Sequence, residues 1–347
     1  MRAFDFIIVG AGFAGSVCAE RLASAGFRVL IIDQRHHIGG NAYDEINEAG
    51  VLVHRYGAHV FHTNAREVFD YLGQFTIWRP YEHRVVSCTR GRLVPFPINR
   101  TTLQAFDGDM DAARAALIEP YTRKQWGPYA DELDSSVLAR VKARDSYDDR
   151  YFTDTFQVMP DEGYTRLFER MLASPRITVR TSTTWQTLEA TEPDLVRGAA
   201  GVIVTGPVDE YFGHQLGRLP YRSARFEFQI QWERTNYPPV VNYPDADVPF
   251  TRIAAFPALT GQDTPHTTIV TEYPMAEGEP YWPVQTAASR ALAAEYRALA
   301  STLPTVHFCG RLGTFRYLNI DQAVAQALRL SAALIARTPL PTPQEVF

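Results

Sequence analysis

A run of apolar residues at positions 4–9 opens the chain, and glycines and a stretch with helical spacing follow it as far as residue 25. Gly26 ends that stretch, and Val29–Ile32 is a second apolar run. This order predicts a strand, a helix and a second strand, the βαβ arrangement of a parallel sheet. Near the other end, a strand is expected at 305–309 and a helix at 321–336, with apolar positions at 320, 324, 327, 328, 331 and 335.

Shorter patterns fill the middle of the chain. Residues 66–75 are expected to form a short helix, residues 84–96 a hairpin around Arg90-Gly91-Arg92, and residues 109–145 mainly helices. Further strands are expected at 176–185, 201–205, 224–232, 250–256 and 267–273. The first and last patterns alternate strand and helix, whereas the middle does not, so we expect the middle to be inserted into an α/β fold.

The composition is that of a globular protein, with 46% hydrophobic and 21% charged residues and a net charge of −5. This balance is not typical of a nucleic-acid-binding protein, and no apolar stretch approaches the roughly 20 residues that span a bilayer. Cys18, Cys88 and Cys309 are scattered and form no CxxC, which is not the spacing of a disulfide framework or a zinc site. We therefore expect a cytoplasmic protein without a metal, a nucleic-acid partner or a membrane partner.

The six residues from Gly10 to Gly15 read G-A-G-F-A-G and lie directly between the first strand and the first helix. In the motif G-x-G-x-x-G the first glycine makes a tight turn, the second lets the backbone approach a pyrophosphate, and the third lets helix and strand pack closely. The helix N-terminus adds N–H groups and a positive dipole end. Asp33 ends the second strand, where an acid bonds ribose hydroxyls. Together these features predict a dinucleotide site.

The residues after Asp33 favour FAD over NAD. A short spacer leads to Gly39-Gly40, which suits a loop that passes under a second part of the cofactor, and simple dehydrogenases lack this extension. Near the other end, Gly310–Gly313 lies between a strand and a helix, so it would bring a late helix N-terminus to the flavin. The cofactor-binding residues expected from these segments are Gly10, Gly12, Phe13, Ala14, Gly15, Asp33, Gln34, Gly39, Gly40, Asn41, Gly310, Arg311, Asn319 and Ile320.

The fold expected is therefore α/β, with a Rossmann-type FAD-binding domain, an inserted antiparallel sheet and a reduced helical lobe. The discontinuous FAD-binding domain is expected to comprise residues 1–75, 176–220 and 300–338. The sheet that contacts substrate takes 76–98 and 221–290, and the helical lobe takes 99–150. Residues 339–347, which are rich in proline, are expected to be a loose tail.

Several specific motifs follow the cofactor loop. They read RYGAHVFHT at 55–63, PFPIN at 95–99, YTRKQWG at 121–127, DRYFTD at 149–154, TGPVDEYF at 205–212, PFTRI at 249–253, TEYP at 271–274, EPYWP at 279–283 and GRL at 310–312. With these motifs in this order, the sequence from about residue 4 to about residue 336 resembles the UDP-galactopyranose mutase family. The resemblance covers nearly the whole chain and is much more specific than the glycine motif alone.

The resemblance implies an isomerase that interconverts the pyranose and furanose forms of a nucleotide-diphosphate sugar. In this family reduced FAD acts without net redox change, through an adduct between the flavin N5 and the sugar. The expected substrate is UDP-galactose or a related sugar, deoxysugars included. Galactofuranose made in this way serves polysaccharide or natural-product biosynthesis.

The resemblance also assigns site residues. Arg140 and Arg252 match the two arginines that bind the pyrophosphate, and a permanently charged, bidentate guanidinium suits a diphosphate leaving group. His59 matches a histidine near the flavin, and we expect it to serve both cofactor and catalysis, together with the two arginines. The residues expected to contact substrate are Trp126, Tyr151, Phe152, Glu272, Tyr281, Trp282 and Tyr317.

The sequence departs from the family pattern in two ways. Only about twenty residues separate Asn99 from Tyr121, where bacterial members carry a much longer helical segment that helps to form the dimer; a homodimer is therefore expected to be weakened or altered. Trp282 and Phe315 stand where the family has tyrosines, so two hydroxyl groups are expected to be lost from the pocket. This loss suggests the hypothesis of a deoxysugar substrate.

Two other readings remain open. One is a flavin oxidase or desaturase of the amine-oxidase type, whose substrates need no pair of arginines. The other is a non-catalytic nucleotide-binding homologue, against which the retention of His59, Arg140, Tyr151, Arg252 and Tyr317 speaks.

Overall fold

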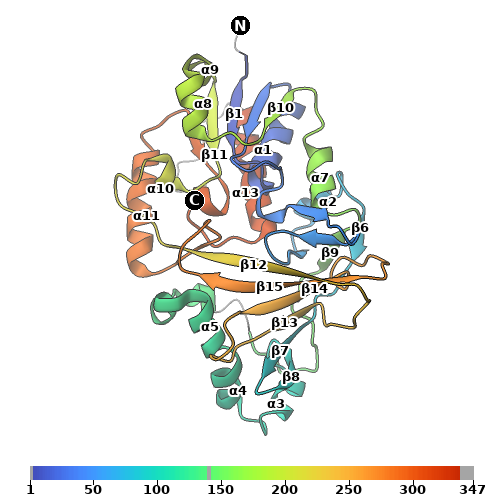
Figure 1. Ribbon diagram of the computed structural model, residues 1–347. Coiled ribbons are helices and arrows are strands. Elements are labelled where there is room, and N and C mark those ends of the chain that lie inside the picture. The colour runs from blue at the N-terminus through green and yellow to red at the C-terminus, as the bar shows by residue number, and fades with distance from the viewer. Residues whose placement is uncertain (1–2, 139–141, 337–347) are drawn as a thin grey trace.

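The structure is a computed structural model that describes residues 3–138 and 142–336 of the 347-residue chain. Arg140 and the tail expected at 339–347 therefore lie outside the described residues. Figure 1 shows a parallel sheet with its helices at one end of the molecule and a second, larger sheet across the middle. The helices α3 (Arg100–Gln104), α4 (Met110–Leu117) and α5 (Glu119–Trp126) lie at the other end.

The parallel sheet has five strands in the order β10-β2-β1-β11-β17, and each neighbouring pair is parallel. The chain places β2 and β10 on one side of β1 and then moves to the other side for β11 and β17. Ligands of α/β sheets bind outside the carboxyl ends of the strands at such a reversal. The strands are β1 (Phe6–Val9), β2 (Val29–Ile32), β10 (Ile177–Arg180), β11 (Gly201–Val204) and β17 (Val306–Phe308).

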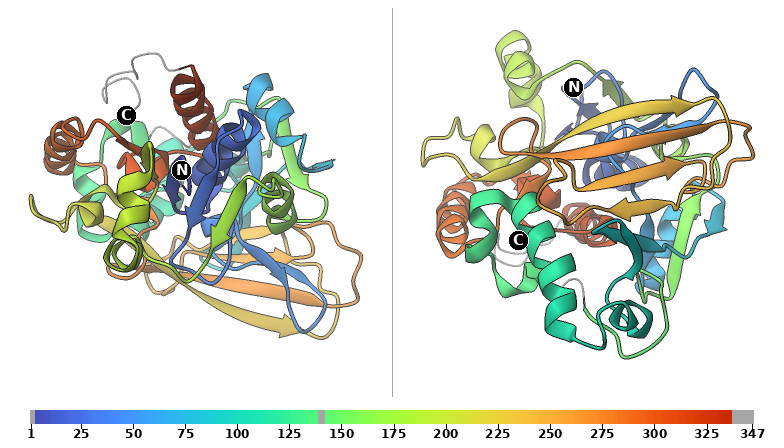
Figure 2. Two further views of the ribbon diagram at one scale, coloured as in Figure 1. Left: turned by 90° about the horizontal axis from the view of Figure 1, so that it is seen from above. Right: turned by 60° about the horizontal axis from the view of Figure 1, so that its bottom comes forward.

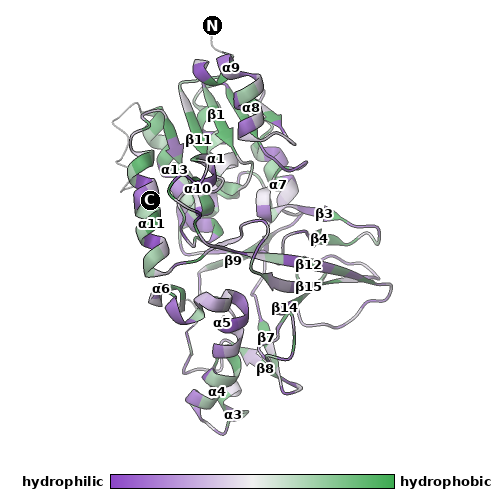
Figure 3. Ribbon diagram, turned by 60° about the vertical axis from the view of Figure 1, so that its left-hand side comes forward, coloured by the Kyte–Doolittle hydropathy of each residue, from purple (hydrophilic) through white to green (hydrophobic). Residues whose placement is uncertain are grey.

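Both faces of this sheet are buried, which explains why its strands are continuous apolar runs. Ile8 and Ile203 belong to a core cluster with α1 (Phe13–Ser24) and α13 (Ile320–Ile335). Ile7 and Leu30 face the opposite way, into a cluster with α8 (Trp185–Thr191) and α11 (Ala287–Ala300). Figure 2 shows α1 and α13 packed side by side, and Figure 3 shows largely hydrophobic strands flanked by helices that carry both hydrophobic and hydrophilic residues.

The larger sheet has seven strands in the order β16-β12-β15-β14-β13-β7-β8. Its neighbouring pairs are antiparallel except that β13 and β7 run parallel, so the expected antiparallel sheet contains one parallel pair. The expected hairpin is β7 and β8, which turn at Arg90-Gly91 with positive φ at both residues. The strands are β7 (Val85–Thr89), β8 (Arg92–Phe96), β12 (Tyr221–Gln231), β13 (Val240–Asn242), β14 (Arg252–Phe256), β15 (Thr267–Met275) and β16 (Trp282–Pro283).

Two small sheets and several short helices join these parts. The strands β3 (Asp44–Ile46) and β4 (Leu52–His54) pair with each other, and β5 (Phe61–Thr63), β9 (Phe156–Pro160) and β6 (Trp78–Pro80) form a three-stranded sheet. The other helices are α2 (Arg66–Leu72), α6 (Ser135–Leu138), α7 (Tyr164–Met171), α9 (Pro193–Gly198), α10 (Val208–Tyr211) and α12 (Gly310–Gly313), and Gly40–Ala42 and Gly127–Glu132 are short 3₁₀ helices.

Two expectations about secondary structure are wrong in detail. The strand expected at 176–185 ends at Arg180, because Thr184 caps α8 by accepting the N–H of Thr187 at 3.1 Å. The segment 109–145 is less helical than expected. Gly127, at φ +58°, ends α5, and residues 142–145 are not helical.

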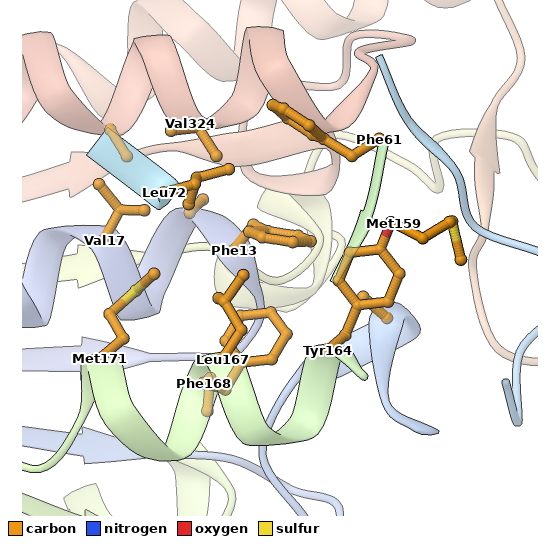
Figure 4. Close-up of a cluster of buried hydrophobic side chains, with 14 of the residues drawn as sticks. Phe13, Val17, Phe61, Leu72, Met159, Tyr164, Leu167, Phe168, Met171 and Val324 are labelled. Atoms are coloured by element: carbon orange, nitrogen blue, oxygen red, sulfur yellow. The ribbon is translucent and has the colours of Figure 1, made fainter. Parts of the chain in front are cut away.

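The main core lies between the parallel sheet and α7. Figure 4 shows Phe13 and Val17 of α1 beside Leu167, Phe168 and Met171 of α7. The rings of Phe13 and Phe168 are 4.7 Å apart between centroids. Because Phe13 follows the first glycines directly, this packing fixes the helix end that faces the predicted cofactor.

Candidate active site

A cavity opens at the carboxyl ends of the parallel strands, where the order of the strands reverses. The segments that follow β1, β2, β11 and β17 all line it, which agrees with the rule for ligand sites in such sheets. Of the residues predicted to bind the cofactor, those that line it are Gly10, Gly12, Phe13, Ala14, Asp33, Gln34, Gly39, Gly40, Asn41, His59, Gly310, Arg311, Asn319 and Ile320.

Gly15 is the predicted cofactor residue that does not line the cavity, and its role is packing. A Cβ added there would lie 1.9 Å from the carbonyl oxygen of Gly10, so only glycine lets α1 pass this close to the turn. Gly10 itself has φ +103°, and a Cβ there would lie 2.1 Å from Thr205 Oγ1. At Gly12 the nearest atom to an added Cβ is 3.7 Å away, in Gly40. The backbone at Gly12 thus stays open to the cavity.

Asp33 braces the glycine turn from inside the cavity. Its carboxylate accepts the N–H of Ala11 at 2.8 Å and the N–H of Arg35 at 2.9 Å. The N–H of Gly39 donates to the Ala11 carbonyl at 2.8 Å, so the second glycine pair is tied to the first turn. Asp33 therefore has a structural task that the sequence did not indicate, in addition to its predicted contact with ribose.

His59 is half-buried and presents its ring to the cavity. Its Nδ1 lies 2.8 Å from the carbonyl oxygen of Gly57. A carbonyl oxygen can only accept, so Nδ1 carries the proton and Nε2 keeps a lone pair. Burial, with smaller effects from His54, Arg311 and Arg252, lowers the pKa of His59 to about 3. At neutral pH the cavity therefore meets a neutral imidazole whose free nitrogen is an acceptor.

Arg252 lies on β14 beside Glu272 of β15, because the two residues are directly paired in the sheet. Arg252 Nε is 3.4 Å from Glu272 Oε2, and its Nη2 donates to the hydroxyl of Tyr121 at 3.1 Å. Burial alone would lower the pKa of Arg252, but Glu272, Tyr121 and Tyr151 raise it, so the charge is permanent. Burial raises the pKa of Glu272 although Arg252 opposes this shift.

The Arg252–Glu272 pair keeps unused hydrogen-bonding capacity. Arg252 Nε and Glu272 Oε1 are buried and have no hydrogen-bond partner in the described part of the chain. Buried polar atoms of folded proteins are normally paired, and an unpaired one calls for an explanation. An anionic ligand beside Arg252 would supply such a partner for the guanidinium.

The predicted aromatic residues form two groups. Tyr151 and Phe152 lie near Arg252, and the Phe152 ring stacks on His62 with centroids 3.6 Å apart. Trp126 and Tyr317 meet edge to face at 5.7 Å, and Trp282 packs against the same small cluster.

Arg311 connects the second aromatic group to the cavity. Its guanidinium lies 5.3 Å from the Tyr317 ring centroid. It donates to the carbonyl of Leu318 at 2.9 Å and to that of Tyr281 at 3.3 Å. Because Arg311 also lines the cavity, the segment after β17 and the loop before β16 meet there.

The structure corrects the prediction that Phe315 lies in the pocket. Phe315 is 2% exposed and packs edge to face against Tyr221 in the second core cluster. A side chain so fully enclosed cannot contact a substrate. The hydroxyl expected to be lost at this position is therefore not lost from the cavity, and the change expected at Trp282, which does not line the cavity, stays a prediction.

Several residues of the site were not predicted. Tyr121 was part of a quoted motif, but its bond to Arg252 depends on the packing of α5 against the sheet. Arg35 lies over the Tyr56 ring at 4.1 Å and donates to Asn41 at 2.8 Å and to Glu279 at 2.7 Å. Further unpredicted lining residues are Thr183, Thr184, Trp185, Gln186, Tyr211 and Glu279. Tyr211 and Glu279 stand in the quoted motifs at 205–212 and 279–283, whereas the signal for the segment from Thr183 to Gln186 was its place after a strand.

The described residues contain no group of three or more His, Cys, Asp or Glu side chains arranged to hold a metal ion. Over the same residues, no helix is both long enough and apolar enough to cross a bilayer.

Comparison with known proteins identifies the family. A family model for UDP-galactopyranose mutase matches residues 116–317, and one for NAD(P)-binding Rossmann-like domains matches residues 8–75. A probable UDP-galactopyranose mutase of Klebsiella pneumoniae is 36% identical over 364 residues, which cover 94% of this chain and 93% of the relative. A dTDP-fucopyranose mutase of Escherichia coli is 30% identical over 371 residues, which cover 95% of this chain and 98% of the relative.

The fold agrees with this result. A crystal structure of reduced UDP-galactopyranose mutase covers 99% of both chains with a TM-score of 0.77, at 14% identity. Because the family model spans more than half of the chain and the relatives match over nearly their whole length, this chain belongs to the UDP-galactopyranose mutase family.

Proposed function

We propose that this chain binds FAD and, with the flavin reduced, interconverts the pyranose and furanose forms of a nucleotide-diphosphate sugar without net oxidation or reduction. The names of the two relatives supply the first substrates to test, UDP-galactopyranose and dTDP-fucopyranose. Family membership supports the type of reaction. The geometry of the cavity supports the cofactor and the roles of individual residues.

FAD fits the cavity at both ends. Asp33 and the segment from Thr183 to Gln186 line one part, and His59 and Arg311 line another, so the cavity extends past a single nucleotide. Gly12 and Gly40 line the cavity, and the backbone at Gly12 leaves room for an added Cβ, which suits the close approach of a pyrophosphate. When bound and reduced, FAD supplies a nucleophilic ring nitrogen that can hold the sugar while its diphosphate is detached.

The protein's part in this reaction is to hold the diphosphate and to exclude water. We assign the diphosphate to Arg252, with Arg140 as its second cation, because charge-assisted bonds from arginine stabilise a departing phosphate most strongly. The hydroxyls of Tyr121, Tyr151 and Tyr317 are assigned to the same anion. The wall of the sugar site is assigned to Trp126, Phe152, Glu272, Tyr281 and Trp282.

One observation carries this proposal. His59 and Arg311 line the same cavity, and Gly57, two residues before His59, contacts Glu272, the partner of Arg252 in the larger sheet, so the Arg252–Glu272 pair lies beside the loop that carries His59. A flavin bound beside His59 would therefore lie near Arg252, a permanently charged residue of the larger sheet. Amine and hydrocarbon substrates of flavin oxidases have no use for that cation, whereas a sugar diphosphate does.

Trp282 bears on the choice of sugar. The indole packs with Trp126 and Tyr317 and offers one N–H, where the family pattern has a hydroxyl. Loss of a hydroxyl partner favours a sugar that lacks a hydroxyl group, because an unpaired polar group in a closed site is costly. We therefore propose a deoxysugar nucleotide as the preferred substrate over its hydroxylated counterpart.

A substrate panel tests these points together. The holoenzyme, reduced with dithionite under argon, is incubated with UDP-galactopyranose, dTDP-fucopyranose and dTDP-galactopyranose, and ring size is determined by chromatography. We expect furanose products only with reduced enzyme and the highest kcat/KM with dTDP-fucopyranose. Oxygen-dependent turnover that yields peroxide would refute the mutase assignment, and a preference for dTDP-galactopyranose over dTDP-fucopyranose would refute the role given to Trp282.

A further inference from the structure

A short loop, residues 55–60, carries His59 from β4 to the cofactor cavity. The loop begins directly after His54, the last residue of β4. His54 is 1% exposed and does not line the cavity, so it contacts neither cofactor nor substrate. None of the roles assigned above uses it.

His54 nevertheless forms a hydrogen bond to the backbone of this loop. Its Nδ1 accepts the backbone N–H of His59 at 3.1 Å. The ring is enclosed by Tyr164 and Phe256, with centroids 5.5 Å and 5.3 Å away. This enclosure lowers the pKa of His54 to about 3, so the ring is neutral and its proton lies on Nε2.

The second ring nitrogen of His54, Nε2, indicates that the histidine serves as a hydrogen-bond acceptor through Nδ1. His54 Nε2 is buried and finds no partner among the described residues. A leucine would fill the same space without an unpaired N–H group, so packing alone does not favour histidine here. Only the bond from Nδ1 to the His59 amide distinguishes histidine from an apolar residue.

The other contacts of His59 hold its main chain only weakly, so the bond to His54 fixes the position of the backbone. The Tyr164 hydroxyl reaches the His59 carbonyl at 3.4 Å, which is a long bond, and His59 Nδ1 bonds within the loop to Gly57. Gly57 has φ +85° and rests on the Glu272 side chain, where an added Cβ would lie 3.2 Å from Oε2. The loop thus rests on the sheet at Gly57 and is tied at His59 by His54.

We propose that His54 is a positioning residue, which by accepting the His59 amide holds the His59 imidazole with its Nε2 lone pair toward the bound flavin. This inference rests on the proposed FAD-dependent function. It extends that function to a residue that touches neither ligand and acts only through the loop.

Two substitutions of similar size distinguish the loss of the hydrogen-bond acceptor from a loss of core packing. His54→Asn keeps an oxygen near the position of Nδ1, whereas His54→Leu fills the space without an acceptor. Val53→Ala, next to His54 and 1% exposed, is the control for a general loss of core packing. All three are prepared as holoenzymes and compared by the visible spectrum of bound FAD, its midpoint potential, and the kcat and KM of the mutase reaction.

We expect His54→Leu to shift the flavin spectrum and potential and to lower kcat roughly tenfold, the effect of one lost hydrogen bond, with KM changed less than about twofold. His54→Asn should restore all three readouts to near the wild-type values. Val53→Ala should lower thermal stability and leave the spectrum and potential unchanged.

Unchanged flavin spectrum and potential in His54→Leu would overturn the proposal, as would equal defects in His54→Leu and His54→Asn. The spectrum and potential need no substrate. If the wild-type protein binds FAD but shows no mutase activity, while His54→Leu still shifts the spectrum, the proposed function fails and the positioning role stands.

Discussion

Arg252 and Glu272 form an ion pair, so a single substitution of either residue would change stability and activity together. Glu272 is 4% exposed, and Arg252 supplies its counter-ion. Removing one partner leaves a buried charge without compensation, which is strongly destabilising whatever the residue does in catalysis. Only a double substitution separates stability from function.

We expect Arg252→Met to abolish detectable turnover and to lower the free energy of unfolding by about 3 kcal/mol, while FAD remains bound. The double variant Arg252→Met/Glu272→Gln should regain most of that stability, measured by urea unfolding, and none of the turnover. Activity in the double variant would mean that Arg252 serves the fold and not the diphosphate.

At the residue scale, the sequence predicted the residues that belong to contiguous motifs. The glycines and Asp33 lie within forty residues of one another, so their spacing alone indicated the cofactor site. Glu279 and Arg35 are separated by 244 positions, and no local pattern could join them. Phe315 shows the opposite error, because a position within a motif was assigned to the pocket although its side chain points into the core.

At the element scale, α7 depends on one distant carboxylate. Gly163 precedes the helix and supplies no side-chain cap. Asp44 of β3 takes that role, accepting the N–H groups of Tyr164 at 2.6 Å and Thr165 at 2.8 Å. This cap fixes α7 against α1, beside the glycine turn.

We expect Asp44→Ala to reduce the free energy of unfolding by about 2 kcal/mol, because two N–H groups at the helix start lose their acceptor. Urea unfolding of the holoenzyme measures this loss. Asp44→Asn keeps one acceptor oxygen and should lose about half as much. A change below about 0.5 kcal/mol in Asp44→Ala would contradict the assigned role.

This cap explains why the sequence did not predict α7. The helix is only eight residues long, and its cap lies about 120 residues earlier in the chain. The expected strand at 176–185 is too long for a related reason, because Thr184 caps a helix that begins at Trp185, an apolar residue that the pattern includes in the strand. The longer elements α1, β12 and α13 carry periodic patterns, and the sequence predicts them within a few residues.

At the scale of the whole molecule, one ion pair links the first glycine loops to the larger sheet across the cavity. Arg35 follows β2, and Glu279 lies between β15 and β16, yet their side chains meet at 2.7 Å and both line the cavity. The Arg35 side chain is 14% exposed and that of Glu279 is 47% exposed. The pair therefore closes the cavity at a place that solvent ions can reach.

We expect Glu279→Gln to release FAD about two- to fivefold faster than wild type in low salt, and the difference should shrink as salt screens the pair. Recovery of FAD fluorescence after dilution gives the rate. Glu277→Gln is the matched control, because Glu277 is exposed in the same segment and does not line the cavity. Equal rates in the two variants would show that the pair does not retain the cofactor.

Buried histidines set the response of the whole molecule to acid. Burial lowers the pKa of His54, His59 and His83 to about 3 and that of His307 to about 4, below the usual value of 6.5. The unfolded chain therefore takes up these protons first, and stability is lost as the pH falls from about 6.5 toward 4. Burial raises the pKa of Asp44 and Glu272, which opposes this loss at the acid end.

Each such histidine lowers the free energy of unfolding by up to about 1.4 kcal/mol for each pH unit of acidification. We expect the Tm of the protein to fall by roughly 10 °C between pH 7.5 and pH 5.0, measured by differential scanning calorimetry. A Tm that stays constant over this range would mean that these histidines are protonated in the folded protein.

Both ends of the chain contribute to the parallel sheet, as the βαβ pattern at the start and the strand and helix near the end predict, and the late strand β17 pairs with β11. The division into discontinuous domains and a homodimer weakened by the short segment before Tyr121 stay predictions. Pairing of β13 with β7, which made one pair of the larger sheet parallel, depends on contacts between segments about 155 residues apart. No local pattern encodes such a contact.

The most direct test of the proposed function is a count of turnovers for each reduced flavin. The holoenzyme is photoreduced under argon with no reductant left over, excess dTDP-fucopyranose is added, and furanose product and flavin spectrum are measured together. We expect many product molecules per flavin, with the spectrum still that of reduced FAD at the end. One product or fewer per flavin, with the flavin reoxidised, would contradict a redox-neutral mutase.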